Sequence, residues 1–227
     1  LHNNCSGKHA GMLLACRLLE LPHAGYTDPA HPLQRRIRSL VARFAGVAES
    51  EIGVAIDGCN APVFRLPLSA LALAYARLTA RSVPGEDRAS AAARARIVRA
   101  MIRRPEMVAG AGRFTTDLMT AGRGRWIAKE GAEGVYAVAL SPDRRGRSTG
   151  IAFKIEDGSA RARDAVTLAV MTRLSVLPDD ARRALAVYAE PVLHNARGLD
   201  VGRVEADVPL VGKRRRSAAP SGRARAR

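Results

Sequence analysis

The sequence predicts an α+β fold in which helices pack on an antiparallel sheet. Three observations indicate this class. Helical periodicity of apolar residues dominates the stretch 7–104, short apolar segments joined by tight turns occupy 125–157, and helical periodicity returns over 160–188. A doubly wound parallel sheet would instead require strands and helices that alternate along the whole chain.

Helices account for most of the first hundred residues. The first follows Ser6 or Asn4, either of which we expect to cap it, and Pro22 ends it. An apolar strand, "IGVAI" at 52–56, stops at the turn cluster "DGCNAP". The helices expected in this half are 7–21, 33–45 (ended by Gly46), 69–79 and 88–104 (closed by Pro105).

The second half of the sequence is expected to form a three-stranded antiparallel meander that lies between helices. A short helix in "GAGRFTTDLMTAG" is expected to be capped by Thr115 or Thr116. The segments "RWIAKE", "VYAVAL" and "TGIAFKIED" have the length and β-branched or aromatic content of strands, and short polar turns separate them. Helices over 160–177 and 180–188 and one last strand complete the expected elements.

Length and charge set limits on the function. The 227 residues suit one domain, 1–212, followed by a basic tail, 213–227, that we expect to be disordered. The net charge of +16 invites a nucleic-acid partner, but seven of the basic residues lie in the tail and aromatic residues make up only 4% of the chain. We therefore expect no nucleic-acid partner; a basic protein whose tail binds nucleic acid is the alternative.

Cysteine content and hydropathy point to a cytoplasmic protein. Cys5, Cys16 and Cys59 are an odd and sparse set, unlike the dense cysteines of secreted scaffolds. No stretch approaches the roughly 18 uncharged apolar residues of a membrane helix. Cys16 falls in an apolar helical stripe and is expected in the core. Because the chain begins with Leu1, we expect that an upstream segment is absent.

The segment "HNNCSGKHAGM" at 2–12 concentrates reactive side chains at a helix start. Cys5, Lys8 and His9 have spacings i, i+3 and i+4, so a helix places them on one side. The N-terminal end of a helix favours negative charge, which would make the cysteine unusually acidic. The alternative is a helix cap followed by a buried cysteine.

A second thiol stands in the turn "DGCNAP", beside Asp57. Two separated cysteines, Cys5 and Cys59, with a nitrogen or a water as further ligands match the preferences of zinc. A structural turn with an incidental cysteine is the alternative.

Lys129 is the third candidate. It follows Trp126 and Ile127 at the end of a strand. Apolar neighbours that desolvate an amine lower its pKa and let it act as a base. Strands also end in solvated lysines, which is the alternative interpretation.

Together these segments resemble the asparaginase II family, typified by the inducible rhizobial enzyme. The resemblance rests on "HNNCSGKHAGM", "IDGCNAP" at 56–62, "GRFTTDLM" at 112–119 and "IAKEGAEGVY" at 127–136, and extends through most of 1–210. It implies a fold like that of serine β-lactamases and glutaminases, usually as a homodimer. It also implies hydrolysis of L-asparagine to aspartate and ammonia.

The resemblance further implies roles for six residues. Cys5, Lys8 and Cys59 occupy the positions that hold zinc in the family, and Lys129 that of a catalytic lysine. His9 and Asp57 would line the same pocket and contact the substrate.

One departure is large, because the family's catalytic Ser-x-x-Lys motif does not occur in this chain. We expect this motif and the N-terminal strands of the sheet upstream, which would leave an unpaired sheet edge here. The alternative is a catalytically dead remnant that retains the metal.

Overall fold

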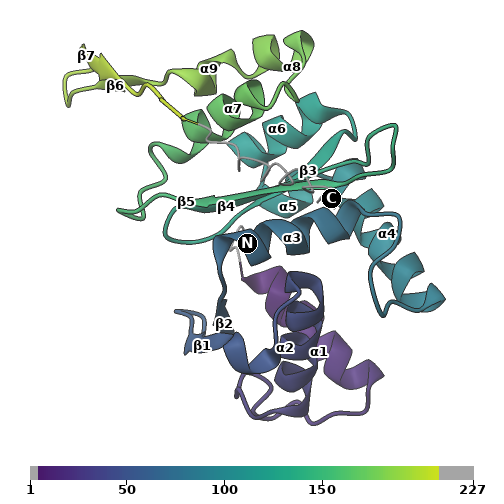
Figure 1. Cartoon of the computed structure of the whole chain (residues 1–227). Coiled ribbons are helices and arrows are strands. Elements are labelled where there is room, and N and C mark those ends of the chain that lie inside the picture. Colours follow the sequence, from purple (N-terminus) through teal and green to yellow (C-terminus); the bar gives the residue numbers. More distant parts are fainter. Residues whose placement is uncertain (1–4, 210–227) are drawn as a thin grey trace, which may run out of the picture.

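A computed structural model describes residues 5–209 of the chain. It is a mixed α+β structure, as predicted. A three-stranded sheet lies across the middle, with α3 on one face and α6 and α7 on the other, while α1, α2 and the hairpin β1–β2 lie beyond α3 (Figure 1). The helices are α1 (Ser6–Leu18), α2 (Pro32–Ala45), the 3-10 turn η1 (Glu49–Glu51), α3 (Leu68–Thr79), α4 (Arg88–Arg103), α5 (Glu106–Ala109), α6 (Phe114–Gly122), α7 (Arg163–Arg173), α8 (Asp179–Ala184) and α9 (Ala186–Ala189).

The predicted meander is present as an antiparallel sheet in the order β3–β4–β5. Its central strand is buried on both faces, with Val138 placed between Ala128 and Ile151 in the register. The indole of Trp126 donates a hydrogen bond of 2.9 Å to the carbonyl of Leu118 in α6 and so fixes that helix over the sheet. The strands are β3 (Trp126–Glu130), β4 (Val135–Leu140) and β5 (Thr149–Lys154).

Two further hairpins stand apart from this sheet. The strand predicted at 52–56 is β1 (Gly53–Ile56), which pairs with β2 (Pro62–Arg65) across a five-residue connection. Near the C-terminal end, β6 (Val192–His194) pairs with β7 (Asp200–Arg203). The sequence led us to expect helices on one sheet; the hairpins form separately because each strand finds its partner across a local turn.

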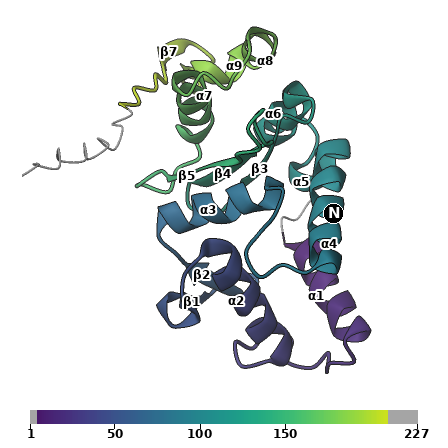
Figure 2. The same ribbon diagram turned by 45° about the vertical axis from the view of Figure 1, so that its right-hand side comes forward.

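Helix α3 packs on the sheet at unusually short range. A methyl group built on Gly150 of β5 would lie 1.8 Å from the carbonyl oxygen of Ala72 in α3. Only a residue without a side chain allows the helix backbone to come this close to the strand. Figure 2 shows α3 running along the sheet between it and the pair β1–β2.

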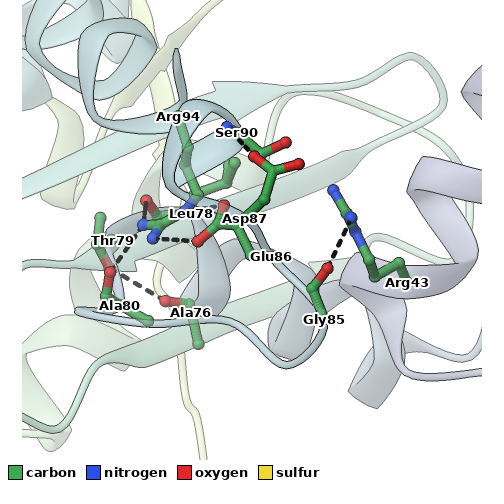
Figure 3. Close-up of polar contacts among 10 residues, drawn as sticks. All are labelled: Arg43, Ala76, Leu78, Thr79, Ala80, Gly85, Glu86, Asp87, Ser90 and Arg94. Atoms are coloured by element: carbon green, nitrogen blue, oxygen red, sulfur yellow. Dashed lines mark hydrogen bonds and ion pairs between the residues drawn. The ribbon is translucent and has the colours of Figure 1, made fainter. Parts of the chain in front are cut away.

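Arg94 of α4 forms a buried ion pair with Glu86 in the preceding loop and also bonds to the end of α3 (Figure 3). The guanidinium of Arg94 lies 2.7 Å from the carboxylate of Glu86, and their side chains are only 7% and 2% exposed. The same guanidinium donates to the carbonyl oxygens of Leu78 and Ala80 at 3.0 and 2.7 Å. Arg94 therefore neutralises a buried carboxylate and satisfies backbone acceptors at the helix end.

Helix ends agree with the sequence only in part. Gly46 ends α2 in the left-handed region (φ 69°), as predicted. The prediction that Ser6 caps the first helix is wrong: Cys5 holds the N-cap position with nearly helical dihedral angles, so the helix begins at Ser6. Asn4, the other predicted cap, lies outside the described residues.

The caps predicted for α6 are also wrong. Arg113 is its N-cap, and Thr115 and Thr116 lie inside the helix with buried side chains. Their hydroxyls bond to tertiary partners instead, Thr116 to the carbonyl of Gly110 at 2.6 Å and Thr115 to residues of the sheet. A threonine cannot cap a helix when burial commits its only hydroxyl to another element.

Helix α7 begins at Arg163 and ends at Arg173, inside the predicted range 160–177. Within 5–209, no helix is long and apolar enough to cross a membrane. The predicted tail, 213–227, lies outside the described residues, so the prediction of disorder there stays a prediction.

Candidate active site

A cavity of about 720 Å³ lies where α1 and the turn after β1 meet the end of β3. Cys5, Lys8 and Asp57 line one side of it. Lys129 lines another side, together with residues of α6, α7 and the turn that follows β3. Segments more than a hundred residues apart in the sequence therefore share one cavity.

Three potential metal ligands gather at one end of this cavity. A ligand atom from each of Cys5, Asp57 and Cys59 lies within 4.8 Å of the other two. Cys5 stands at the start of α1, and the other two belong to the tight turn after β1. That turn is closed by a hydrogen bond of 2.9 Å from the Asp57 amide to the Ala61 carbonyl and has Asn60 at φ 63°.

Lys8 supplies the positive charge of this cluster. Its amine lies 3.5 Å from Oδ2 of Asp57. Burial lowers the pKa of Lys8, but a hydrogen bond with Cys59 and the nearby acidic groups outweigh burial and raise it above its usual value. The amide of Gly58 and the amine of Lys8 hold the pKa of Asp57 below its usual value. Without a metal, the pair is therefore an ammonium beside a carboxylate.

The two thiols differ in acidity. A hydrogen bond with His9, assisted by the backbone amide of Ala61, lowers the pKa of Cys59 to about 7. Nδ1 of His9 is 2.8 Å from the hydroxyl of Tyr26, which orients the ring and leaves Nε2 for the thiolate. The pKa of Cys5 is raised, because its hydrogen bond with Cys59 holds its own proton. Near pH 7, Cys59 is therefore partly ionised, whereas Cys5 keeps its proton.

The residues present fit a zinc ion. Two thiolates at zinc–sulfur distances of about 2.3 Å would stand roughly 3.8 Å apart in a tetrahedron, within the 4.8 Å limit of this cluster. Asp57 adds a third ligand atom that the sequence interpretation placed with the substrate. Lys8, predicted as a ligand, is adjacent but must lose a proton to bind a metal. Cys16 is fully buried in the core, as predicted.

Lys129 lies half-buried at the opposite side of the cavity. It follows three fully buried residues of β3, and its amine donates a hydrogen bond of 2.8 Å to the carbonyl of Glu130. Ala137 faces it on β4. The strand thus holds this amine at the cavity, on the sheet face that α3 covers.

Glu130 belongs to a chain of hydrogen bonds that sequence reasoning missed. It pairs with Tyr136 in the β3–β4 register, so both side chains lie on the face covered by α6. The hydroxyl of Thr115, in the first turn of α6, donates to Oε2 of Glu130 and lies 2.9 Å from the hydroxyl of Tyr136. Thr115 and Tyr136 are fully buried, whereas Glu130 reaches the cavity.

Two arginines add positive charge to the cavity. Arg113 precedes α6 and is exposed, and Arg163 begins α7. Arg163 donates to Asp164 at 2.8 Å and lies over the ring of Tyr136, 5.6 Å from its centre. No local pattern marks either residue, because arginines are frequent throughout this sequence.

Residues 1–206 match the model of the family described as L-asparaginase II. The chain belongs to the L-asparaginase II family. The resemblance stated from the four sequence motifs is thereby confirmed, and these motifs supply every residue that lines the cavity except Arg163. No curated protein matches the chain.

For a member of the L-asparaginase II family, this cavity is the candidate active site of an amide hydrolase. All six residues predicted for the site lie at or beside it: Cys5, Lys8, His9, Asp57, Cys59 and Lys129. Sequence reasoning missed Thr115, Glu130 and the two arginines. A weak signal existed for Glu130, which directly follows Lys129.

Proposed function

We propose that the protein hydrolyses the side-chain amide of L-asparagine to L-aspartate and ammonia. The observation that carries this proposal is the single cavity that holds Lys129 at one side and the Cys5–Asp57–Cys59 cluster at another, in a chain that matches the family over 1–206. A volume of about 720 Å³ accommodates a small amino acid.

Amide hydrolysis needs a nucleophile, a base that takes its proton and an acid that protonates the leaving ammonia. Lys129 is the proposed base, since it is the lysine that the strand holds at the cavity. The proposed nucleophile is the serine of a Ser-x-x-Lys motif, which the sequence 1–227 does not contain. In this proposal, a longer reading frame supplies that serine. Its oxygen bonds to the amide carbon as the C–N bond breaks, and Lys129 passes the serine proton to the departing ammonia; a water molecule then cleaves the resulting ester, which releases L-aspartate and the serine.

We propose zinc as the cofactor, held by Cys5, Cys59 and Asp57 with Lys8 beside them. A zinc ion there supplies positive charge that orients a polar substrate. His9 orients Cys59 through a hydrogen bond and is itself held by Tyr26. A homodimer and a cytoplasmic location, both expected from the sequence, stay proposals that light scattering and cell fractionation test.

The test is release of ammonia from L-asparagine by the protein expressed from the complete reading frame. Lys129→Met should lower kcat by about 100-fold or more, since a positioned base contributes on that order. Lys154→Met is the matched control, because Lys154 also extends from a strand of the sheet and donates to a backbone carbonyl, that of Glu133 in the turn between β3 and β4 at 2.6 Å, but lies outside the cavity.

Unchanged turnover in Lys129→Met would show that Lys129 is not the base. Absence of ammonia release by the complete, folded protein would contradict the proposed activity itself and favour a remnant that retains only the metal.

A further inference from the structure

We propose that this cavity recognises the free α-amino acid group of its substrate, with Glu130 binding the α-ammonium and Arg163 binding the α-carboxylate. The inference deepens the proposed function and rests on it for the identity of the ligand as L-asparagine. Recognition of a zwitterion follows from the charges themselves and is measurable without turnover.

Glu130 is a carboxylate that its neighbours hold in place. Thr115 has a single hydroxyl proton and donates it to Oε2 of Glu130, so at the 2.9 Å contact the hydroxyl of Tyr136 must donate to Thr115. This chain of donors, buried between α6 and the sheet, fixes one carboxylate oxygen. The other carboxylate oxygen of Glu130 has no hydrogen-bond partner among residues 5–209, and Glu130 lines the cavity beside Lys129, whose amine bonds to the Glu130 backbone carbonyl rather than to its carboxylate.

Arg163 is a cavity-lining cation that contacts this network through Tyr136. Its Nε donates to Asp164 at 2.8 Å, its guanidinium lies over the ring of Tyr136, and its side chain is 17% exposed. In the described part of the chain, nothing accepts a hydrogen bond from its two terminal nitrogens. A guanidinium fixed on one edge presents the geometry that binds a carboxylate through paired hydrogen bonds.

The two charges share Tyr136 as a support but do not neutralise each other. Within residues 5–209, Glu130 and Arg163 form no ion pair, although both line the cavity. Each is positioned by a separate set of contacts, Glu130 by Thr115 and Arg163 by Asp164. A ligand that carries an ammonium and a carboxylate satisfies both, whereas a simple anion or cation satisfies only one.

The test is calorimetric binding of three ligands to the full chain: L-asparagine, succinamate, which lacks the ammonium, and β-alaninamide, which lacks the carboxylate. If the substrate is turned over, L-aspartate, succinate and β-alanine replace them. Glu130→Gln should weaken binding of L-asparagine and β-alaninamide by about 10-fold or more, the loss expected for a charged hydrogen bond, and leave succinamate unchanged. Glutamine keeps an acceptor for Thr115, so the fold is preserved.

Arg163→Lys should show the opposite selectivity, because it keeps the charge but loses the paired donors. It should weaken the binding of L-asparagine and succinamate and leave the binding of β-alaninamide unchanged. Glu133→Gln and Arg161→Lys, both at exposed neighbouring positions outside the cavity, are the matched controls. Thr115 acts as a positioning residue, so Thr115→Val should copy the pattern of Glu130→Gln and Thr115→Ser should restore the original selectivity.

The inference is overturned if Glu130→Gln weakens all three ligands equally, if it weakens none, or if the unsubstituted protein binds no amino acid. The crossed pattern without asparagine hydrolysis by the protein from the complete reading frame would support the recognition site and contradict the proposed activity. Lys129-dependent hydrolysis without the crossed pattern would support the activity and contradict the recognition site.

Discussion

The amine of Lys8 lies 3.5 Å from Oδ2 of Asp57. This contact joins the first turn of α1 to the turn after β1, two segments almost fifty residues apart in the sequence. The two thiols lie in the same cluster, and the cavity beside this cluster also contains Lys129. The contact therefore lies where the start of α1 and the turn after β1 together form one side of the candidate site.

Zinc binding should depend on the two half-buried cysteines and not on the third. Cys5→Ser and Cys59→Ser should each lower the zinc content measured by elemental analysis well below one ion per chain, because a serine hydroxyl is a poor ligand for zinc. Cys16→Ala is the control and should retain the metal, since Cys16 lies in the core. Full zinc content in both serine variants would exclude the cluster as the metal site.

Lys8 and Asp57 should contribute differently to zinc affinity. If Asp57 is the third ligand, Asp57→Ala should weaken zinc binding by about 10-fold or more, because the loss of even an outer-shell partner typically costs about 10- to 100-fold in metal affinity. Lys8→Met should then change the affinity less. A larger loss in Lys8→Met, in competition titrations with a chelator, would restore lysine as the ligand. Affinity should rise with pH in either case, because the ligands must lose protons.

Cys59 should be the more reactive thiol of the metal-free protein. Its pKa of about 7 means that the thiolate predominates above that pH, whereas Cys5, whose pKa is raised, stays protonated. After EDTA has removed any metal, the rate at which iodoacetamide alkylates Cys59, followed by mass spectrometry over a range of pH, should therefore rise with a midpoint near pH 7. His9→Ala should move this midpoint upward, since it removes the main hydrogen bond to the thiolate. An unmoved midpoint would contradict that cause.

Arg94→Met should cost about 3–5 kcal/mol in the free energy of unfolding, because it leaves Glu86 buried without its partner. The double variant with Glu86→Gln should lose less. Arg94 lowers the pKa of Glu86 below its ordinary value of 4.5, so the pair stabilises the fold fully above that pH and loses its effect as the pH falls through the lower, folded value. Urea unfolding should show that Arg94→Met loses less unfolding free energy in acid than at pH 7. An equal loss at both pH values would contradict the assignment of Arg94 as the partner of ionised Glu86.

The same substitution should have opposite effects at two glycines. Gly150→Ala should destabilise the protein by about 1–3 kcal/mol or prevent folding, because its methyl group would overlap the Ala72 carbonyl. Gly11→Ala, inside α1 with no atom within 4 Å of the added carbon, should stabilise by about 0.5–1 kcal/mol. Thermal melts followed by circular dichroism measure both. A tolerated Gly150→Ala would show that α3 lies farther from β5.

Local patterns predicted the elements better than their ends. Apolar periodicity located α2 to within a residue and identified β3, β4 and β5, because burial of one face imposes the same spacing on the sequence. The caps predicted at Ser6 and Thr115 failed for different reasons. Ser6 is already the first residue of α1, so the N-cap position falls on Cys5, whereas the hydroxyl of Thr115 is committed to Glu130 and Tyr136.

By itself, the sequence determined the α+β class, the family and the identity of the residues that carry chemistry. Thiols, amines and carboxylates are recognisable one at a time, and their local spacing places Cys5 beside Lys8 and Asp57 beside Cys59. Only the tertiary structure decided that these pairs meet, that Asp57 joins the thiols, and that Glu130 and Arg163 face the same cavity without neutralising each other. Distances between segments far apart in the chain depend on how α1, α6 and α7 pack, and no local pattern encodes that packing.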